Sequence, residues 1–347
     1  MDKIKNKKSP NIAFISVSQM INILQNIGIE SFIVGLVDYL EQDFSKWESF
    51  DKSPRFAAHS PDGVIELMPI GDHENFSFKY VNGHPKNTQS GLQTVTAFGV
   101  LSDVATGYPL LLSEMTILTA IRTAATSVMM AKYLAPKNAS VMAMIGCGAQ
   151  SEFQIIAFSK MLNINTIRLY DIDPLAVEKC HKNIANKGLN IIICNSAHEV
   201  VQGADIITTC TADKKNATVL TNEMISKGVH INAIGGDCPG KTELDAQLLK
   251  RADIFVEYEP QTRVEGDIQQ LPDCSFVTEM FRVIRGESLG RTDRQQITIF
   301  DGVGFAIEDY SALRFLYDLV KEDGQYQELE ILANPENPRN LYGLTLE

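Results

Sequence analysis

The chain has 347 residues, of which 44% are apolar and 21% charged, a composition that is typical of globular proteins and excludes a largely disordered chain. Acidic residues number 43 and basic residues 31, for a formal net charge of −12, which argues against nucleic acid or an anionic membrane surface as a partner. No apolar run reaches the ~18 residues of a transmembrane helix, so no membrane span is expected.

The cysteines and the first residues indicate the compartment. The cysteines form no C-x-x-C pair and all lie in the second half of the chain, which predicts reduced thiols in a cytoplasmic protein. Residues 1–10 are basic, but the apolar core of a signal peptide does not follow them. The six cysteines are Cys147, Cys180, Cys194, Cys210, Cys238 and Cys274.

The first third of the chain predicts an α+β region. Residues 11–25 have the pattern of a strand followed by an amphipathic helix, and residues 56–115 that of antiparallel strands. Residues 75–81 alternate cleanly, with three aromatic residues on one face and Lys79 on the other, so Lys79 is expected to point into a cavity or into solvent. A helix rich in Ala, Met and Leu follows and stops at Pro136.

From residue 139 the pattern changes to alternating strands and helices. The predicted strands are short and almost continuously apolar, as expected of parallel strands that are buried on both faces. They are residues 139–146, 166–171, 190–194, 204–211, 229–236 and 253–259. The alternation predicts an α/β fold with an open, doubly wound sheet of the Rossmann type. A further helix starts at Ala306, and we expect the C-terminal tail to pack back on the first region.

A glycine turn follows the first of these strands. Gly146 and Gly148 begin a G-x-G-x-x-S pattern, with Ser151 where a third glycine or alanine is usual, and a predicted helix starts there. Such a turn lets backbone approach a pyrophosphate at a helix N-terminus. Asp171 ends the next strand, where a carboxylate holds ribose hydroxyls and favours NAD over NADP. The alternative is a turn kept for packing alone.

Two later strands end at the same edge of the sheet. One ends in residues 209–211 and the other in residues 233–236, directly before Asp237. Ligands of open α/β sheets bind at the carboxyl ends of strands, so Asp237 is placed to take a proton or hold an amine. The alternative is that Asp237 caps a helix that starts near Thr242.

Three cations stand out in the first region. Arg55 precedes the antiparallel strands, Lys79 lies within them, and Arg122 sits in the first turn of the helix that follows. Spacing alone favours surface charges, but together the three can clamp a carboxylate. The six histidines show no metal-binding spacing, and no metal is predicted.

Several blocks of the sequence resemble the ornithine cyclodeaminase/mu-crystallin family, and in particular its cyclodeaminase branch. The resemblance covers residues 15–325 approximately, and its most specific blocks are GGDCPGKTEL and EYEPQTR. The other blocks are HSPDGVIELMPI, FKYVNGHP, SEMTILTAIRTAATS, IGCGAQSEFQ and GVGFAIEDY. The family fold implies an NAD-binding Rossmann domain over residues 122–319. It also implies a substrate-binding and homodimerisation domain made of residues 1–121 and 320–347.

The resemblance also implies roles for individual residues. The substrate carboxylate is assigned to Arg55, Lys79 and Arg122, and the amine and proton transfer to Asp237 as the catalytic residue. Val303 is placed at the substrate pocket, and Glu66 at water or the distal amine. The implied dinucleotide contacts are Thr94, Arg122, Gly146, Gly148, Ala149, Gln150, Asp171, Cys210, Thr211, Ala233, Ile234, Gly235, Gly236, Lys241 and Gly302.

The implied activity is the conversion of L-ornithine to L-proline and ammonia with NAD⁺ used catalytically. Three alternatives stay open at this point. An NAD(P)-dependent amino-acid dehydrogenase or ketimine reductase would use the same cofactor without ring closure, and a lysine cyclodeaminase would differ in pocket size. A non-catalytic, mu-crystallin-like dinucleotide-binding protein is an alternative of another class.

Overall fold

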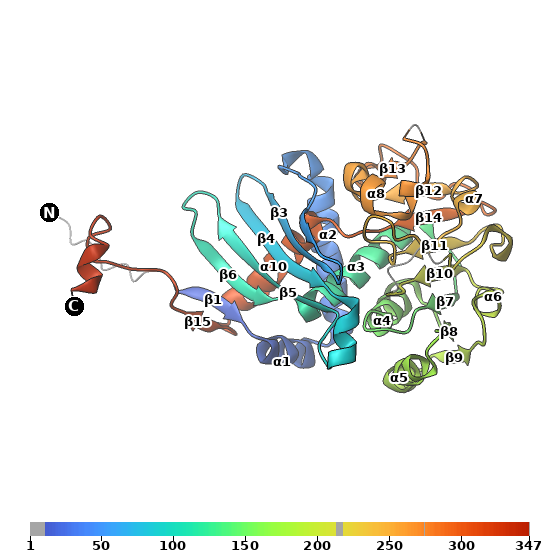
Figure 1. Cartoon of the computed structure of the whole chain (residues 1–347), viewed down its shortest axis with the longest axis horizontal. Helices are drawn as coiled ribbons and strands as arrows, with labels where there is room; N and C mark the ends of the chain where they lie inside the picture. The colour runs from blue at the N-terminus through green and yellow to red at the C-terminus, as the bar shows by residue number, and fades with distance from the viewer. Residues whose placement is uncertain (1–10, 213–217, 274, 347) are drawn as a thin grey trace.

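The computed structural model describes residues 11–212, 218–273 and 275–346. The basic start and Cys274 lie outside the described residues. Two sheets form the body, and helix α3 (Thr116–Leu134) runs between them (Figure 1). The C-terminal segment leaves the first sheet and projects away from the rest of the chain at the left of the view (Figure 1).

The first sheet is mixed. Its strands are β1 Ile12–Ile15, β2 Phe56–His59, β3 Val64–Gly71, β4 Asn75–Gly83, β5 Val95–Asp103, β6 Pro109–Glu114 and β15 Gln327–Leu329. Their order is β15-β1-β6-β5-β4-β3-β2, with β2 to β6 antiparallel and β1 parallel to β6. The antiparallel region predicted over residues 56–115 is thus confirmed, whereas the pairing of β1 and β15 was not foreseen.

The second sheet is parallel in every recorded pairing. Its strands are β7 Val141–Ile145, β8 Thr166–Tyr170, β9 Asn190–Ile193, β10 Ile206–Thr209, β11 His230–Ala233, β12 Asp253–Val256, β13 Thr278–Glu279 and β14 Thr298–Asp301. The order β13-β12-β14-β11-β10-β7-β8-β9 reverses direction between β7 and β10. This reversal is the switch point at which doubly wound sheets bind ligands, and the α/β Rossmann-type prediction is confirmed.

Strand β14 was missed by the sequence reasoning although it lies inside the sheet. It is four residues long and fully buried between β11 and β12. The residues before β14 are polar, and a strand of only four residues is too short to show a recognisable pattern of apolar residues.

The helices cover these sheets. Those that the structure describes are α1 Val17–Ile27, α2 Ile29–Ser45, α3, α4 Ser151–Leu162, α5 Pro174–Ile184, α6 Ala197–Val200, α7 Ala246–Leu249, α8 Glu259–Glu265, α9 Met280–Ile284 and α10 Ala306–Lys321. None of them is by itself long and apolar enough to cross a membrane. Helices α1 and α2 reach that length and composition only as a pair, which is bent by 99°.

Helix α10 belongs by its packing to the first sheet. It contacts β3, β4 and β5 as well as α2, and the Phe315 ring lies edge-on to the Phe32 and Tyr39 rings of α2 at 4.9 and 5.1 Å. The predicted domain boundary after residue 319 instead groups this helix with the parallel sheet. We therefore propose a boundary just before α10, because apolar burial is what holds a helix in its domain.

Candidate functional site

The glycine turn lies at the switch point of the parallel sheet. Gly146 follows β7 with φ of 96°, and a Cβ at this position would lie 2.5 Å from the carbonyl oxygen of Cys210. Only glycine meets both conditions without strain. The turn then exposes Gly148 and Ala149 directly before α4. When a glycine turn leads into a helix, the first backbone N–H groups of the helix can bind an anion.

Ser151, at the third position of the pattern, is fully buried. Its hydroxyl donates to the carbonyl oxygen of Gly148 at 2.8 Å. A serine is therefore small enough for the close packing of α4, as predicted, and it also closes the turn.

Asp171 holds the glycine turn against the next strand. Its Oδ2 accepts the backbone N–H of Cys147 at 2.7 Å, and its Oδ1 accepts that of Asp173 at 2.9 Å. The carboxylate thus lies beside the turn, directly after β8, as the sequence predicted. Its contact with ribose stays a prediction.

The segment after β10 is fixed by a carboxylate that the sequence reasoning missed. Glu243 accepts the backbone N–H of Thr211 at 2.9 Å and also the Thr211 hydroxyl. Burial raises the pKa of Glu243 above its usual value. A Cβ on Gly235 would overlap the Glu243 carboxyl, so this glycine is required by close approach. The available signal was an acid seven residues after the Gly-Gly pair.

Asp237 leaves the turn after β11 and faces outward. Its side chain is 53% exposed, and its Oδ1 lies 3.2 Å from Nζ of the buried Lys241. The alternative role as a helix cap is wrong, because α7 begins at Ala246 and Asp245 caps it by accepting the N–H of Gln247. Asp237 is therefore free to meet a ligand at the carboxyl edge of the sheet.

Lys79 and Arg122 share one carboxylate. Lys79 Nζ lies 2.8 Å from Asp309 Oδ1, and Arg122 Nε lies 3.0 Å from the same atom. Arg122 Nη1 also pairs with Glu308 at 2.5 Å. All four side chains are buried, so the surface-charge interpretation of these cations is wrong. Both acids, at the start of α10, were missed, although two adjacent acids in a first helical turn are a readable signal.

Two details of these cations need correction. Lys79 does not point into solvent, because its side chain is 1% exposed beneath α10. Arg122 lies in the second turn of α3 rather than the first, because the helix begins at Thr116. Burial, followed by the nearby Arg122, lowers the pKa of Lys79 to about 8, while Asp309 opposes the shift.

Arg55 is held by carboxylates and by backbone. Its Nη1 lies 3.1 Å from Glu66 and its Nε 3.2 Å from Glu265, and Nη2 donates to the carbonyl oxygen of Val303 at 2.7 Å. The guanidinium is thus buried rather than a surface charge. Arg55 also contributes to the lowered pKa of Lys79, so the structure brings the three predicted cations into one region.

The other predicted cofactor residues surround the same edge. Gln150 Nε2 donates to the carbonyl oxygen of Ala120 at 3.0 Å, and the Cys210 thiol donates to that of Gly146 at 3.3 Å. Gly302 N–H donates to the carbonyl oxygen of Ala233 at 2.8 Å. Ile234 and Gly236 belong to the turn after β11, and Thr94 precedes β5. The roles of these residues toward a dinucleotide stay predictions.

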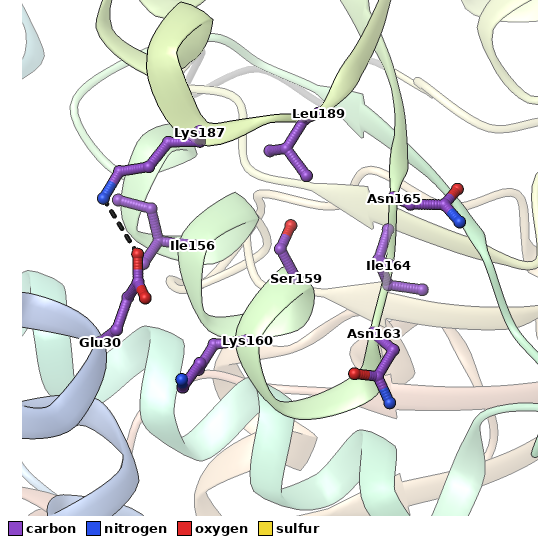
Figure 2. Close-up of a pocket in the computed structure, with 9 residues that line it drawn as sticks. All are labelled: Glu30, Ile156, Ser159, Lys160, Asn163, Ile164, Asn165, Lys187 and Leu189. Atoms are coloured by element: carbon purple, nitrogen blue, oxygen red, sulfur yellow. Dashed lines mark hydrogen bonds and ion pairs between the residues drawn. The ribbon is translucent and has the colours of Figure 1, made fainter.

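A separate cavity of about 370 Å³ lies against the C-terminal half of α4 (Figure 2). Across it, Lys187 Nζ pairs with Glu30 at 3.0 Å, and Lys160 extends from the last turn of α4 (Figure 2). None of the residues predicted for the site lines this cavity. A lysine at a helix C-terminus complements the helix dipole, and we assign no catalytic or binding role to this cavity.

The residues present fit a dinucleotide. The turn at Gly146 has room only for backbone, open space surrounds Gly148, and the places of the missing Cβ atoms of Gly235 and Gly236 are taken by the carboxyl groups of Glu243 and Asp267. A helix N-terminus, a carboxylate at Asp171 and small residues at the switch point are the elements that bind pyrophosphate and ribose in such sheets.

The sequence is similar to known proteins over most of its length. The model of the ornithine cyclodeaminase/mu-crystallin family matches residues 17–324. An ornithine cyclodeaminase of Brucella melitensis biotype 1 is 59% identical over 335 residues, which cover 96% of this chain and 93% of that protein.

Solved structures share the fold. A lysine cyclodeaminase, described as recognising L-lysine, L-ornithine and L-2,4-diaminobutyric acid, matches with a TM-score of 0.90 and 26% identity over 96% of this chain and 99% of its own. An archaeal alanine dehydrogenase dimer with bound NAD matches with a TM-score of 0.83 and 28% identity over 93% of this chain and 100% of its own.

Proposed function

This chain belongs to the ornithine cyclodeaminase/mu-crystallin family, and on this premise we propose that it converts L-ornithine to L-proline and ammonia, with NAD⁺ recycled in each turnover. The observation that carries the proposal is the 59% identity to a Brucella ornithine cyclodeaminase over 96% of the chain. The mu-crystallin-like alternative, a binding protein without catalysis, gives no use for three cations with buried side chains in one region with Asp237.

The charges of the site suit a diamino acid. Arg55, Lys79 and Arg122 supply positive charge for one carboxylate, as arginine and lysine do at anion sites. Glu66 and Glu265 contact Arg55, and together with Asp237 they raise the pKa of Arg55 against the effect of its burial. Carboxylates therefore also lie near the cations, where they can meet the ammonium groups of ornithine. A substrate with one carboxylate and two ammonium groups matches this arrangement.

The chain's residues then have separate tasks. We propose that the Gly146–Gly148 turn, Asp171 and the Gly235–Gly236 turn hold the dinucleotide, which supplies hydride acceptance and return at the α-carbon. The cations fix the substrate carboxylate and so select the face that reacts. Asp237 holds an amine group of the substrate and accepts a proton from it. The tethered δ-amine closes the five-membered ring rapidly because the nucleophile is intramolecular.

A product assay tests this function. Purified protein is incubated with L-ornithine and sub-stoichiometric NAD⁺, and proline and ammonia are quantified against time. We expect many turnovers per NAD⁺, with the two products in equal amounts. Accumulation of NADH without proline would point to a dehydrogenase, and turnover of L-lysine in preference to L-ornithine would point to a lysine cyclodeaminase.

We also propose that the enzyme is a homodimer that pairs through the outer face of the first sheet. Phe56, Leu67, Tyr80 and Phe98 lie opposite one another across four neighbouring strands. Phe56 is 71% and Phe98 44% exposed, and an apolar row of this kind on a sheet marks an interaction site. A second copy is the proposed occupant, because the structurally similar alanine dehydrogenase is described as a dimer.

The Phe98→Glu variant is expected to be monomeric, because an unpaired charge that the partner copy would bury in this row opposes association. Size-exclusion chromatography with light scattering measures the mass. The matched control is Leu289→Glu, which adds the same charge at an exposed apolar residue outside the row and should leave the dimer intact. A dimeric Phe98→Glu variant would exclude this face as the interface.

The proposed location is the cytoplasm. The five cysteines that the structure describes are free thiols, as is usual in reducing compartments. The pathway context, proline formation from ornithine within ornithine and arginine catabolism, is likewise proposed from the reaction itself.

A further inference from the structure

Glu265 is a buried carboxyl group near Arg55, and none of the proposed steps above uses it. It ends α8 and is 8% exposed. Its Oε2 lies 3.2 Å from Arg55 Nε, yet neither of these buried atoms makes a hydrogen bond within the part of the chain that the structure describes. The Nε–H of Arg55 and this oxygen of Glu265 therefore form an ion pair without the geometry of a hydrogen bond.

The other two nitrogens of Arg55 each have a partner. Nη1 donates to Glu66, and Nη2 donates to the backbone oxygens of Val303 and Gly304 at 2.7 and 2.6 Å. These bonds fix the guanidinium plane. Nη1 carries two N–H groups but makes one hydrogen bond within the described part of the chain, so its second N–H is where a further anion can bind. A substrate carboxylate bound there shares the guanidinium with Glu265.

The charged groups around Glu265 make its ionisation sensitive to the binding of a substrate carboxylate at Arg55. Burial raises the pKa of Glu265 to about 7, the negative charges of Glu66 and Asp237 raise it too, and Arg55 opposes them. An additional carboxylate on Arg55 both shares the positive charge and adds a negative one. Both effects favour the protonated form of Glu265.

Building on the proposed function, we propose that Glu265 takes a proton from the α-ammonium group of the substrate when the substrate carboxylate binds at Arg55. One N–H bond of the ammonium breaks, one O–H bond forms on Glu265, and the electron pair stays on nitrogen. No oxidant or reductant takes part. The α-ammonium is the donor because it is attached to the same carbon as the carboxylate, which places it beside Glu265.

This step has a clear use in the reaction. The α-carbon gives up hydride readily only when the lone pair of its nitrogen is free. Glu265 creates that lone pair on binding, so substrate capture and activation are one event. Asp237 differs from Glu265 because its side chain is 53% exposed and paired with Lys241. In this proposal Asp237 serves the δ-amine, which reacts in a later step.

The test compares wild type, Glu265→Gln and Glu265→Asp, with Glu259→Gln as the matched control on the same helix. Glu259 is 40% exposed and pairs with Arg263. Proline formation is followed from pH 5.5 to 9, NADH binding by fluorescence titration, and folding by thermal melting. In wild type, kcat/KM should rise with pH through about 7, because the ionised carboxylate is the active form.

In Glu265→Gln we expect kcat to fall about 10²–10⁴-fold, the range for losing a positioned proton acceptor. The rise of kcat/KM near pH 7 should disappear, while NADH affinity stays unchanged. Glu265→Asp should recover part of the rate, and Glu259→Gln should behave as wild type. A Glu265→Gln variant with near-normal kcat, or with the rise still near pH 7, would overturn the proposal.

Glu66→Gln gives a second measurement that leaves Glu265 in place and guards against a misfolded variant. Removing the Glu66 charge should lower the pKa of Glu265, so the rise in kcat/KM moves to lower pH whatever the absolute rate. A rise that does not move contradicts the proposal. If wild type forms no proline at all, the proposed function fails and this inference fails with it, which is a different result from an active wild type with an indifferent Glu265.

Discussion

The Asp237→Asn variant is expected to bind NADH as wild type does and to lose turnover on the order of 10³-fold or more, in the upper part of the range for a positioned acid or base. The amide keeps the shape of the side chain but accepts no proton and carries no charge for the substrate amine. Folding should change little, because the Lys241–Asp237 pair is half exposed at Asp237 and such pairs contribute about 0–1 kcal/mol. Steady-state proline formation and NADH fluorescence titration measure the two properties separately.

Asp245→Asn is the control for this variant. Asp245 lies eight residues later and caps α7 by accepting the N–H of Gln247, a bond that asparagine also makes. Its turnover should stay near that of wild type. If Asp237→Asn keeps more than a tenth of the wild-type kcat, Asp237 does not move the proton and the catalytic role must lie elsewhere.

Arg122→Ala is expected to have the largest combined effect on stability and substrate use. The change removes the partner of Glu308 and one of two partners of Asp309, both nearly fully buried. Breaking a buried ion pair from one side costs on the order of 3–5 kcal/mol, because the other charge is left without compensation. The same change removes a cation from the proposed carboxylate clamp, so KM for L-ornithine should rise and kcat should fall.

Urea unfolding and steady-state kinetics measure the two effects. Lys132→Ala is the matched control on the same helix, since Lys132 pairs with Glu41 at 2.5 Å with 35% of its side chain exposed. An exposed pair of this kind should change the free energy of unfolding by at most about 1 kcal/mol. An Arg122→Ala enzyme whose response to ornithine matches wild type would contradict the clamp, even if its stability falls as expected.

The position of the dinucleotide turn could be read from local pattern alone. Gly146 and Gly148 stand between an apolar strand and a helix, and Asp171 ends the next strand. Each of these features is set by neighbours in the sequence, since backbone geometry and strand burial are local properties. For the same reason the parallel sheet, and the place of Asp237 after one of its strands, followed from the sequence.

The partners of the charged residues could not be read in the same way. Lys79 and Asp309 are 230 residues apart in the chain, and Arg122 and Glu308 are 186 apart. Lys79 is set apart from an ordinary strand lysine only by the packing of α10 over its face of the sheet. The resemblance to the family supplied the cations, but not the acids that hold them.

The sequence by itself determined the two kinds of sheet, the glycine turn after β7 and the place of Asp237 after β11, because strand alternation, glycine turns and strand ends are encoded over a few residues. Only the tertiary structure decided that the three cations are buried, that Glu243 fixes Thr211, and that Glu265 faces Arg55. The physical reason is that the energy of a charge depends on its burial and on the distance to other charges. Both quantities are set by segments that meet only when the chain has folded.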